Sequence, residues 1–135
     1  MKKGHLIFIS LIILIISISA VSAGLFNNNN SKIQVDNLKV TDDGYDMYKI
    51  TCDLKANEEI DYLEMQVVFY DDSGAILEKT PLAWNMNSVP EGQTIKVDGL
   101  SVVSSGTPAK AEVYFFDDVL SNDLSDAIYN ETVQL

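Results

Sequence analysis

The chain has 135 residues, enough for one domain with a single hydrophobic core. It carries 20 Asp and Glu residues against 9 lysines and no arginine, and its formal net charge is −11. A surface this acidic repels nucleic acid and anionic lipid headgroups. Because the chain has no arginine, bidentate recognition of phosphate is also ruled out, and we exclude nucleic acid as a partner.

The first residues have the pattern of an export signal. Lys2 and Lys3 precede an uncharged apolar run over residues 6–21, and Val21-Ser22-Ala23 follows it. A positive start, an apolar run and small residues before a cleavage point are typical of a secretory signal peptide, so we expect residues 1–23 to be cleaved after Ala23.

Two alternatives keep this segment in the mature protein. The uncharged stretch over residues 6–26 is long enough to span a bilayer, which would make it a retained apolar anchor helix. Alternatively, pilin-like cleavage after Gly4 would leave it as an assembly helix, although the early glutamate usual in pilin-type subunits is absent. For the signal peptide and the anchor alike, we expect the lysines to stay inside and the acidic body to lie outside the cytoplasm.

Residues 24–31 are rich in asparagine and are expected to form a flexible spacer before the folded domain at residues 32–135. Asn29 and Asn130 each begin an Asn-x-Ser/Thr sequence, so both are candidate glycosylation sites in an exported protein.

Beyond the spacer, apolar and polar residues alternate in short segments that turn residues separate. An alternation of period two indicates a strand with one buried and one wet face. The pattern predicts strands over residues 33–40, 48–54, 62–70, 75–82, 94–103, 110–116 and 128–135. Seven strands at this spacing are typical of an immunoglobulin-like antiparallel β-sandwich, which is the fold class we expect.

Some of the expected elements have individual features. Pro81 predicts an edge position for the strand over residues 75–82, because proline cannot donate to a strand ladder. We expect a loop over residues 85–92, a bulge at Gly99, and one helical turn in the acidic loop over residues 117–126.

A family resemblance lies in two runs, Met65-Gln66-Val67-Val68-Phe69-Tyr70-Asp71-Asp72-Ser73-Gly74 and Val89-Pro90-Glu91-Gly92-Gln93. They resemble the FxLYD domain, in which a strand ends in Phe-x-Leu-Tyr-Asp before a glycine turn, and a later turn is of Pro-Gly type. Val67 stands where the family prefers Phe, and Glu91 separates Pro90 from Gly92. The resemblance covers residues 45–118 and implies an immunoglobulin-like, extracytoplasmic module without known catalytic residues.

The folded domain lacks most of the groups that catalysis uses. The only histidine, His5, lies in the export segment, so no Ser–His pair, Cys–His pair or His metal site is available to the mature domain. Cys52 has no disulfide partner and is expected to be a small buried apolar residue. Carboxylate pairs for glycoside cleavage stay open, because 20 acidic residues supply many pairs. We expect no enzyme, no catalytic residue and no cofactor other than a possible calcium ion.

Two ligand sites follow from the residues. Trp84 beside Asn85 and Asn87 could stack on a sugar and hydrogen-bond it, or Trp84 could simply cover the core.

If consecutive strands alternate direction, four aspartates from two loops would converge at one end, beside the turn over residues 104–108. Such an oxygen-rich group would suit calcium, or it would be a solvated acidic rim; the four are Asp42, Asp43, Asp71 and Asp72.

These expectations favour a non-enzymatic interaction module at the cell surface, exported or membrane-tethered, which recognises a protein or a cell-envelope component through loops or a strand edge. The alternatives are a structural subunit of a surface filament with a retained N-terminal helix, and a carbohydrate-binding module. Membrane contact is expected only through the N-terminal segment, if that segment is uncleaved.

Overall fold

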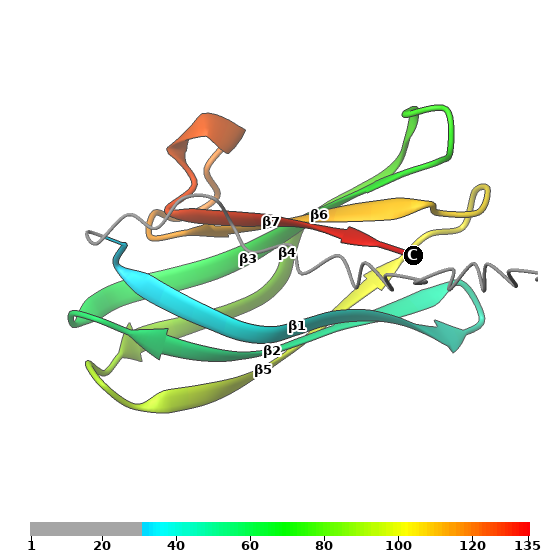
Figure 1. Ribbon diagram of the computed structural model, residues 1–135. Helices are drawn as coiled ribbons and strands as arrows, with labels where there is room; N and C mark the ends of the chain where they lie inside the picture. Colours follow the sequence, from blue (N-terminus) through cyan, green and yellow to red (C-terminus); the bar gives the residue numbers. More distant parts are fainter. Residues whose placement is uncertain (1–30) are drawn as a thin grey trace, which may run out of the picture.

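The computed structural model describes residues 31–135; the predicted signal peptide, all but the last residue of the spacer and the sequon at Asn29 lie outside the described residues. The described residues fold into seven strands and one 3₁₀ turn, shown in Figure 1. The elements are β1 (Ile33–Gly44), β2 (Met47–Ala56), β3 (Ile60–Tyr70), β4 (Ile76–Val89), β5 (Thr94–Val102), β6 (Lys110–Phe116), η1 (Leu124–Asp126) and β7 (Tyr129–Gln134).

The strands form two antiparallel sheets, one of three strands in the order β1-β2-β5 and one of four in the order β4-β3-β6-β7. Figure 1 shows the sheets as two layers, so the expected all-β sandwich is confirmed. Within residues 31–135 no helix is long and apolar enough to cross a membrane.

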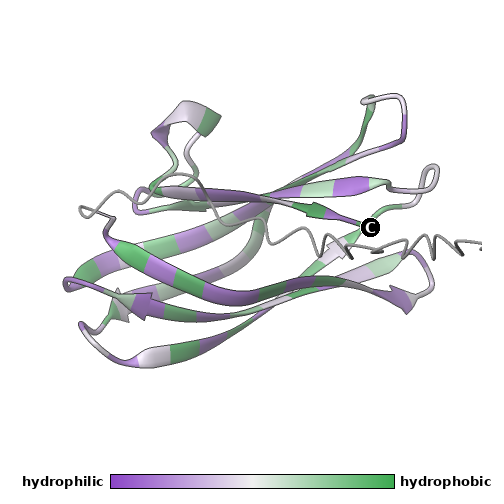
Figure 2. Ribbon diagram, in the orientation of Figure 1, coloured by the Kyte–Doolittle hydropathy of each residue, from purple (hydrophilic) through white to green (hydrophobic). Residues whose placement is uncertain are grey.

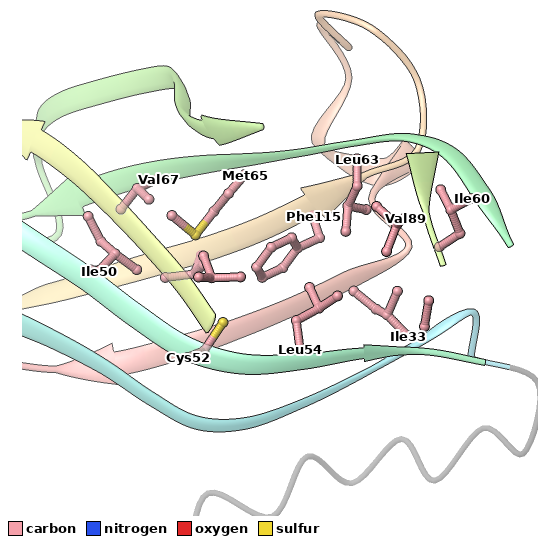
Figure 3. Packing of buried hydrophobic residues seen from close by; sticks show 14 of the residues in the cluster. Ile33, Ile50, Cys52, Leu54, Ile60, Leu63, Met65, Val67, Val89 and Phe115 are labelled. Atoms are coloured by element: carbon pink, nitrogen blue, oxygen red, sulfur yellow. The ribbon is translucent and has the colours of Figure 1, made fainter. Parts of the chain in front are cut away.

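The core lies between the layers, where the inner faces of both sheets meet (Figure 3). The predicted inner face of β3 is confirmed, since Leu63, Met65, Val67 and Phe69 are all fully buried. On β2, Ile50, Cys52 and Leu54 are buried as predicted, and the alternation of apolar and polar residues along the strands is visible in Figure 2. Burying one such side chain contributes about 1.5–3 kcal/mol, so this cluster is the main source of stability.

The fourth strand is longer than predicted. Residues 85–89, expected in a loop, continue β4 to Val89, with Asn85 paired to Glu64 and Asn87 paired to Tyr62 of β3. Asparagine is a poor strand former, but strand preference depends on context, and here the neighbouring ladder outweighs it. The edge position predicted from Pro81 is confirmed, because β4 is the first strand of its sheet.

Gly99 does not mark the predicted bulge. It pairs with Ile50 in an unbroken register between β2 and β5. A Cβ atom at Gly99 would lie 2.3 Å from the Met65 Cε atom and 3.1 Å from the Ala83 carbonyl oxygen. The glycine therefore serves the close approach of β4 to β5, which is the other common reason for glycine inside a strand.

The strand β3 is buried on both sides. On its outer side Glu64, Gln66 and Val68 are as inaccessible to solvent as the core residues. The loop over residues 117–127 lies over part of this side and contains the expected helical turn, η1.

Candidate functional site

Four of the seven lysines in residues 31–135 lie on the outer side of the three-stranded sheet. Side chains alternate across a strand, and the neighbours of these lysines point into the core, so the lysines point outward. We call this surface the lysine face. It comprises Asp36, Lys39, Lys49, Thr51, Asp53, Lys55, Lys96, Asp98, Leu100 and Val102.

The charge of the lysine face differs from that of the rest of the protein. Its four lysines stand beside three aspartates, Asp36, Asp53 and Asp98. All other residues from 31 to 135 together carry three lysines and seventeen acidic side chains. The lysine face is therefore the surface of the described domain on which cations are not outnumbered, and it would attract an acidic partner.

Ion pairs hold two of the four lysines of this face. Lys96 Nζ lies 2.5 Å from Asp53 Oδ1, and Lys49 Nζ lies 3.2 Å from Asp98 Oδ2. Asn37, at the bulge of β1, donates a hydrogen bond of 2.9 Å to Asp53 Oδ2. The hydrogen bonds from Lys96 and Asn37 hold the pKa of Asp53 below its usual range. Exposed pairs add little stability, so the main effect of the Lys96–Asp53 pair is to order one ammonium group beside a shallow depression of about 420 Å³.

One end of the lysine face is apolar. Leu100 and Val102 are 49% and 52% exposed, and Met47 lies opposite Val102 in the ladder. Tyr45 in the adjacent turn is 96% exposed. The Val103 amide donates to the Asp46 carbonyl over 2.8 Å and so ties this turn to the end of β5. Single exposed apolar residues are ordinary, but a group of them beside charged residues is typical of an interaction surface.

A second surface with exposed apolar side chains is the loop over residues 117–126, which we call the acidic loop. It carries Asp117, Asp118, Asp123 and Asp126, and its apolar residues Val119 and Leu120 are 60% and 56% exposed. It lies on the other sheet, above β3 and β6 in Figure 1.

Two buried side chains of β3 fix the acidic loop. Glu64 Oε1 accepts a hydrogen bond of 3.2 Å from the Ser121 amide, and Gln66 Nε2 donates one of 2.8 Å to the Ser121 carbonyl. Lys32 Nζ lies 2.6 Å from Asp117 Oδ2 at the base of the loop. Buried polar groups keep such partners because losing them is costly, so the loop is held in one position.

Beside the acidic loop, the outer side of the four-stranded sheet carries a strip of tyrosines. Glu112 Oε2 accepts hydrogen bonds from Tyr70, at 2.9 Å, and from Tyr114. Lys110 Nζ lies 4.8 Å above the centre of the Tyr70 ring. Burial and the hydrogen bond to Glu112 raise the pKa of both tyrosines. The hydroxyl groups of Tyr70 and Tyr114 are thus both bound to Glu112.

The residues of the predicted sugar site do not share one face. Trp84 packs against the core with its ring 6.3 Å from that of Phe115, whereas Asn85 and Asn87 are exposed. Neighbouring residues of a strand point to opposite sides, so the indole and the two amides cannot contact one ligand together. Trp84 covers the core, as the second interpretation expects.

The predicted calcium residues are Asp42 and Asp43 at the end of β1 and Asp71 and Asp72 in the turn after β3, and they are not gathered into one site. Asp71 Oδ1 accepts hydrogen bonds from the Ser73 amide and hydroxyl and from the Ala75 amide, which lower the pKa of Asp71. Asp42 Oδ1 accepts one from the Gly44 amide. In residues 31–135 no three His, Cys, Asp or Glu side chains are placed to hold a metal ion together, so Asp43 and Asp72 do not complete a cluster.

Two further predicted residues have clear positions. Cys52 is buried and free, as expected, and burial raises the pKa of its thiol to about 12. Asn130 lies exposed on β7, on the same side of the sheet as Tyr114, with which it pairs.

Comparison with known proteins gives a fold likeness alone. No protein-family model matches the chain, and no curated protein matches it significantly. A penta-heme cytochrome c552 from Thermochromatium tepidum is similar in structure, with a TM-score of 0.53 and 10% identity over 77% of this chain and 40% of the cytochrome.

Weaker likenesses link the chain to two glycosidases. The β-glucosidase of family GH3 from Bifidobacterium adolescentis has a TM-score of 0.46 and 11% identity over 76% of this chain and 17% of the enzyme. The β-glucosidase 3B from Thermotoga neapolitana has a TM-score of 0.45 and 12% identity over 78% of this chain and 16% of the enzyme. The chain thus spans less than half of the length of each of these proteins, and likenesses this distant say nothing about its activity.

Proposed function

We propose that this chain is an exported or membrane-tethered, non-enzymatic interaction module at the cell surface that binds a protein or cell-envelope component through the lysine face. The proposal includes the immunoglobulin-like form of the sandwich, which the resemblance to the FxLYD domain implies. The observation that carries it is the separation of charge, with four lysines and an exposed apolar end on one side of a domain that is otherwise strongly acidic.

The chemistry of the described residues supports a binding role over catalysis. Residues 31–135 contain no histidine, and their one thiol is buried with a raised pKa, which makes it a poor nucleophile. On the lysine face Asp53 and Asp98 are already paired with lysines, so neither is poised as an acid or a base.

The location rests on the sequence of the first 23 residues and on the acidic composition. The exposed position of Asn130 is compatible with glycosylation of an exported domain, because the acceptor of that modification must be accessible.

Amine labelling on intact cells tests both parts of the proposal. A membrane-impermeant acylating reagent is applied to cells of the natural host and, separately, to the purified dilute protein, and each lysine is quantified by mass spectrometry. Lys79 is exposed on β4 in the other sheet and is the internal reference. We expect Lys79 to be labelled on cells, which shows export, and Lys39 and Lys96 to be protected on cells relative to Lys79.

Two results would overturn the proposal. If Lys79 is labelled only after the cells are broken, the domain is not outside the membrane. If the ratio of Lys39 and Lys96 labelling to Lys79 labelling is the same on cells and in the purified protein, the lysine face is not occupied.

A further inference from the structure

We propose that the occupant of the lysine face is a second copy of this chain, which places its acidic loop on that face head to tail. This inference rests on the proposed function, because it names the partner of the same surface.

The two surfaces match in charge and in apolar character. The acidic loop carries four aspartates and no lysine, and the lysine face carries four of the domain's seven lysines. The exposed Val119 and Leu120 of the loop would meet Leu100 and Val102 at the apolar end of the face, so that apolar surface exposed on each copy is buried. Opposite charges around an apolar centre are the usual arrangement of a specific interface.

The acidic loop holds its exposed apolar residues in a fixed conformation. Leu120 has a φ of 50°, a left-handed conformation that a leucine adopts only when its surroundings impose it. The next residue, Ser121, donates a hydrogen bond from its amide to the buried Glu64 and accepts one at its carbonyl from the buried Gln66. Leu120 is thus held in a strained conformation while its side chain is 56% exposed. Strain of this kind gathers where a segment has a function, which supports a partner for this residue.

Charge disfavours other placements of the loop on a second copy. Outside the lysine face, the described residues carry three lysines against seventeen acidic side chains. One of the three, Lys32, is already bound to Asp117 and Glu58. Elsewhere on the domain the aspartates of the loop would mostly face like charges, which is unfavourable.

One molecule cannot make this contact with itself. The acidic loop lies over the four-stranded sheet, and the lysine face is the outer side of the three-stranded sheet, so the sandwich separates them (Figure 1). The contact joins different surfaces of two copies, and each added copy leaves one loop and one face free. Repetition gives a row of domains, which favours the filament subunit among the alternative functions.

Cross-linking of the full chain in detergent solution tests the inference. Copies carrying light and heavy isotopes are mixed in equal amounts and treated with a carbodiimide, which joins a lysine amine directly to a neighbouring carboxylate. We expect cross-linked peptides of mixed isotope that join Lys39, Lys49 or Lys96 to aspartates of residues 117–126. Peptides of mixed isotope arise only between copies.

Paired variants show which surfaces make the contact. Leu100→Asp places a charge at the apolar end of the face, and Val119→Asp places one at the exposed apolar residues of the loop, so each variant alone should lose the mixed cross-links. In a mixture of heavy L100D and light V119D, the heavy copy keeps an intact loop and the light copy keeps an intact lysine face. The cross-links should therefore return, but only between lysines of the light copy and loop aspartates of the heavy copy. Ile76→Asp is the matched control, because Ile76 is 61% exposed outside both surfaces and its replacement should leave the cross-links unchanged.

The wild-type mixture is decisive even if a variant fails to fold. Absence of mixed cross-links between the lysine face and the loop overturns self-docking. A loss of these cross-links in I76D as large as in L100D and V119D overturns it as well. If face lysines are protected on cells but do not cross-link to the loop, the proposed function stands and the occupant is another molecule. If they are neither protected nor cross-linked, both proposals fail.

Discussion

Replacing Gly99 with alanine is expected to destabilise the domain, because the added methyl group would collide with the buried Met65 side chain and lie close to the β4 backbone. The added Cβ atom would lie 2.3 Å from Met65 Cε, 3.1 Å from the Ala83 carbonyl oxygen and 3.5 Å from Trp84 Cβ. The first distance is far inside van der Waals contact, so the methionine must move. Met65 is fully buried, and a packed core leaves its methyl group little room.

The expected cost follows from two opposing effects. Overpacking a core costs about 1–3 kcal/mol, and losing the glycine's freedom in the unfolded chain returns about 0.4–1 kcal/mol. Gly99 does not have a left-handed backbone, so alanine adds no backbone strain. We expect a net loss of about 1–2 kcal/mol in the free energy of unfolding, or a Tm lower by about 4–8 °C for each kcal/mol.

Urea unfolding followed by tryptophan fluorescence measures this loss at the right place, because Trp84 is the only tryptophan and touches the site of the change. Met65→Ala in the same background completes a double-mutant cycle. The double variant should be less destabilised than the sum of the single variants by more than about 0.5 kcal/mol, since the new methyl group enters space that Met65 leaves. An alanine variant as stable as the wild type, or strict additivity in the cycle, would refute the packing argument.

Three other outcomes are expected. Val67→Asp should lower the free energy of unfolding by several kcal/mol, because it places an unpaired charge in a fully buried position. Thr51→Asp, on the lysine face, should lower it far less. Equal falls in Tm for the two variants, followed by circular dichroism, would contradict the assignment of inner and outer faces. Cys52 should react with a thiol reagent at pH 8 only after unfolding, because burial raises the pKa of its thiol to about 12. The free energy of unfolding should also fall as the pH rises above about 8.5, because the thiol of the unfolded chain ionises there and that of the folded chain does not. Rapid labelling of the native protein would show instead that the thiol is accessible. Millimolar calcium should leave Tm unchanged, because the four aspartates predicted to bind it are not grouped into one site. A rise in Tm with calcium that the double variant Asp43→Asn, Asp71→Asn abolishes would show that the calcium site exists.

The strands and their inner faces could be predicted because alternation is a local property. Leu63, Met65, Val67 and Phe69 alternate with other residues within one segment, and a period of two is enough to group them. Features that depend on a neighbouring strand could not be obtained in this way. Residues 85–89 have a loop-like composition and form a strand because β3 lies beside them, and the role of Gly99 depends on where β4 crosses β5.

The lysine face and the acidic loop depend on such neighbours even more. The alternation of β2 already places Lys49, Thr51 and Asp53 on a wet face, but nothing local brings Lys96, 43 residues further on, beside Asp53. Gln66 likewise sits on the side of β3 that its alternation assigns to solvent, and it is buried because residues 55 positions later cover it. Strand order within each sheet thus gathers four of the seven lysines of residues 31–135 on one side of an acidic domain, an arrangement that composition alone could not predict.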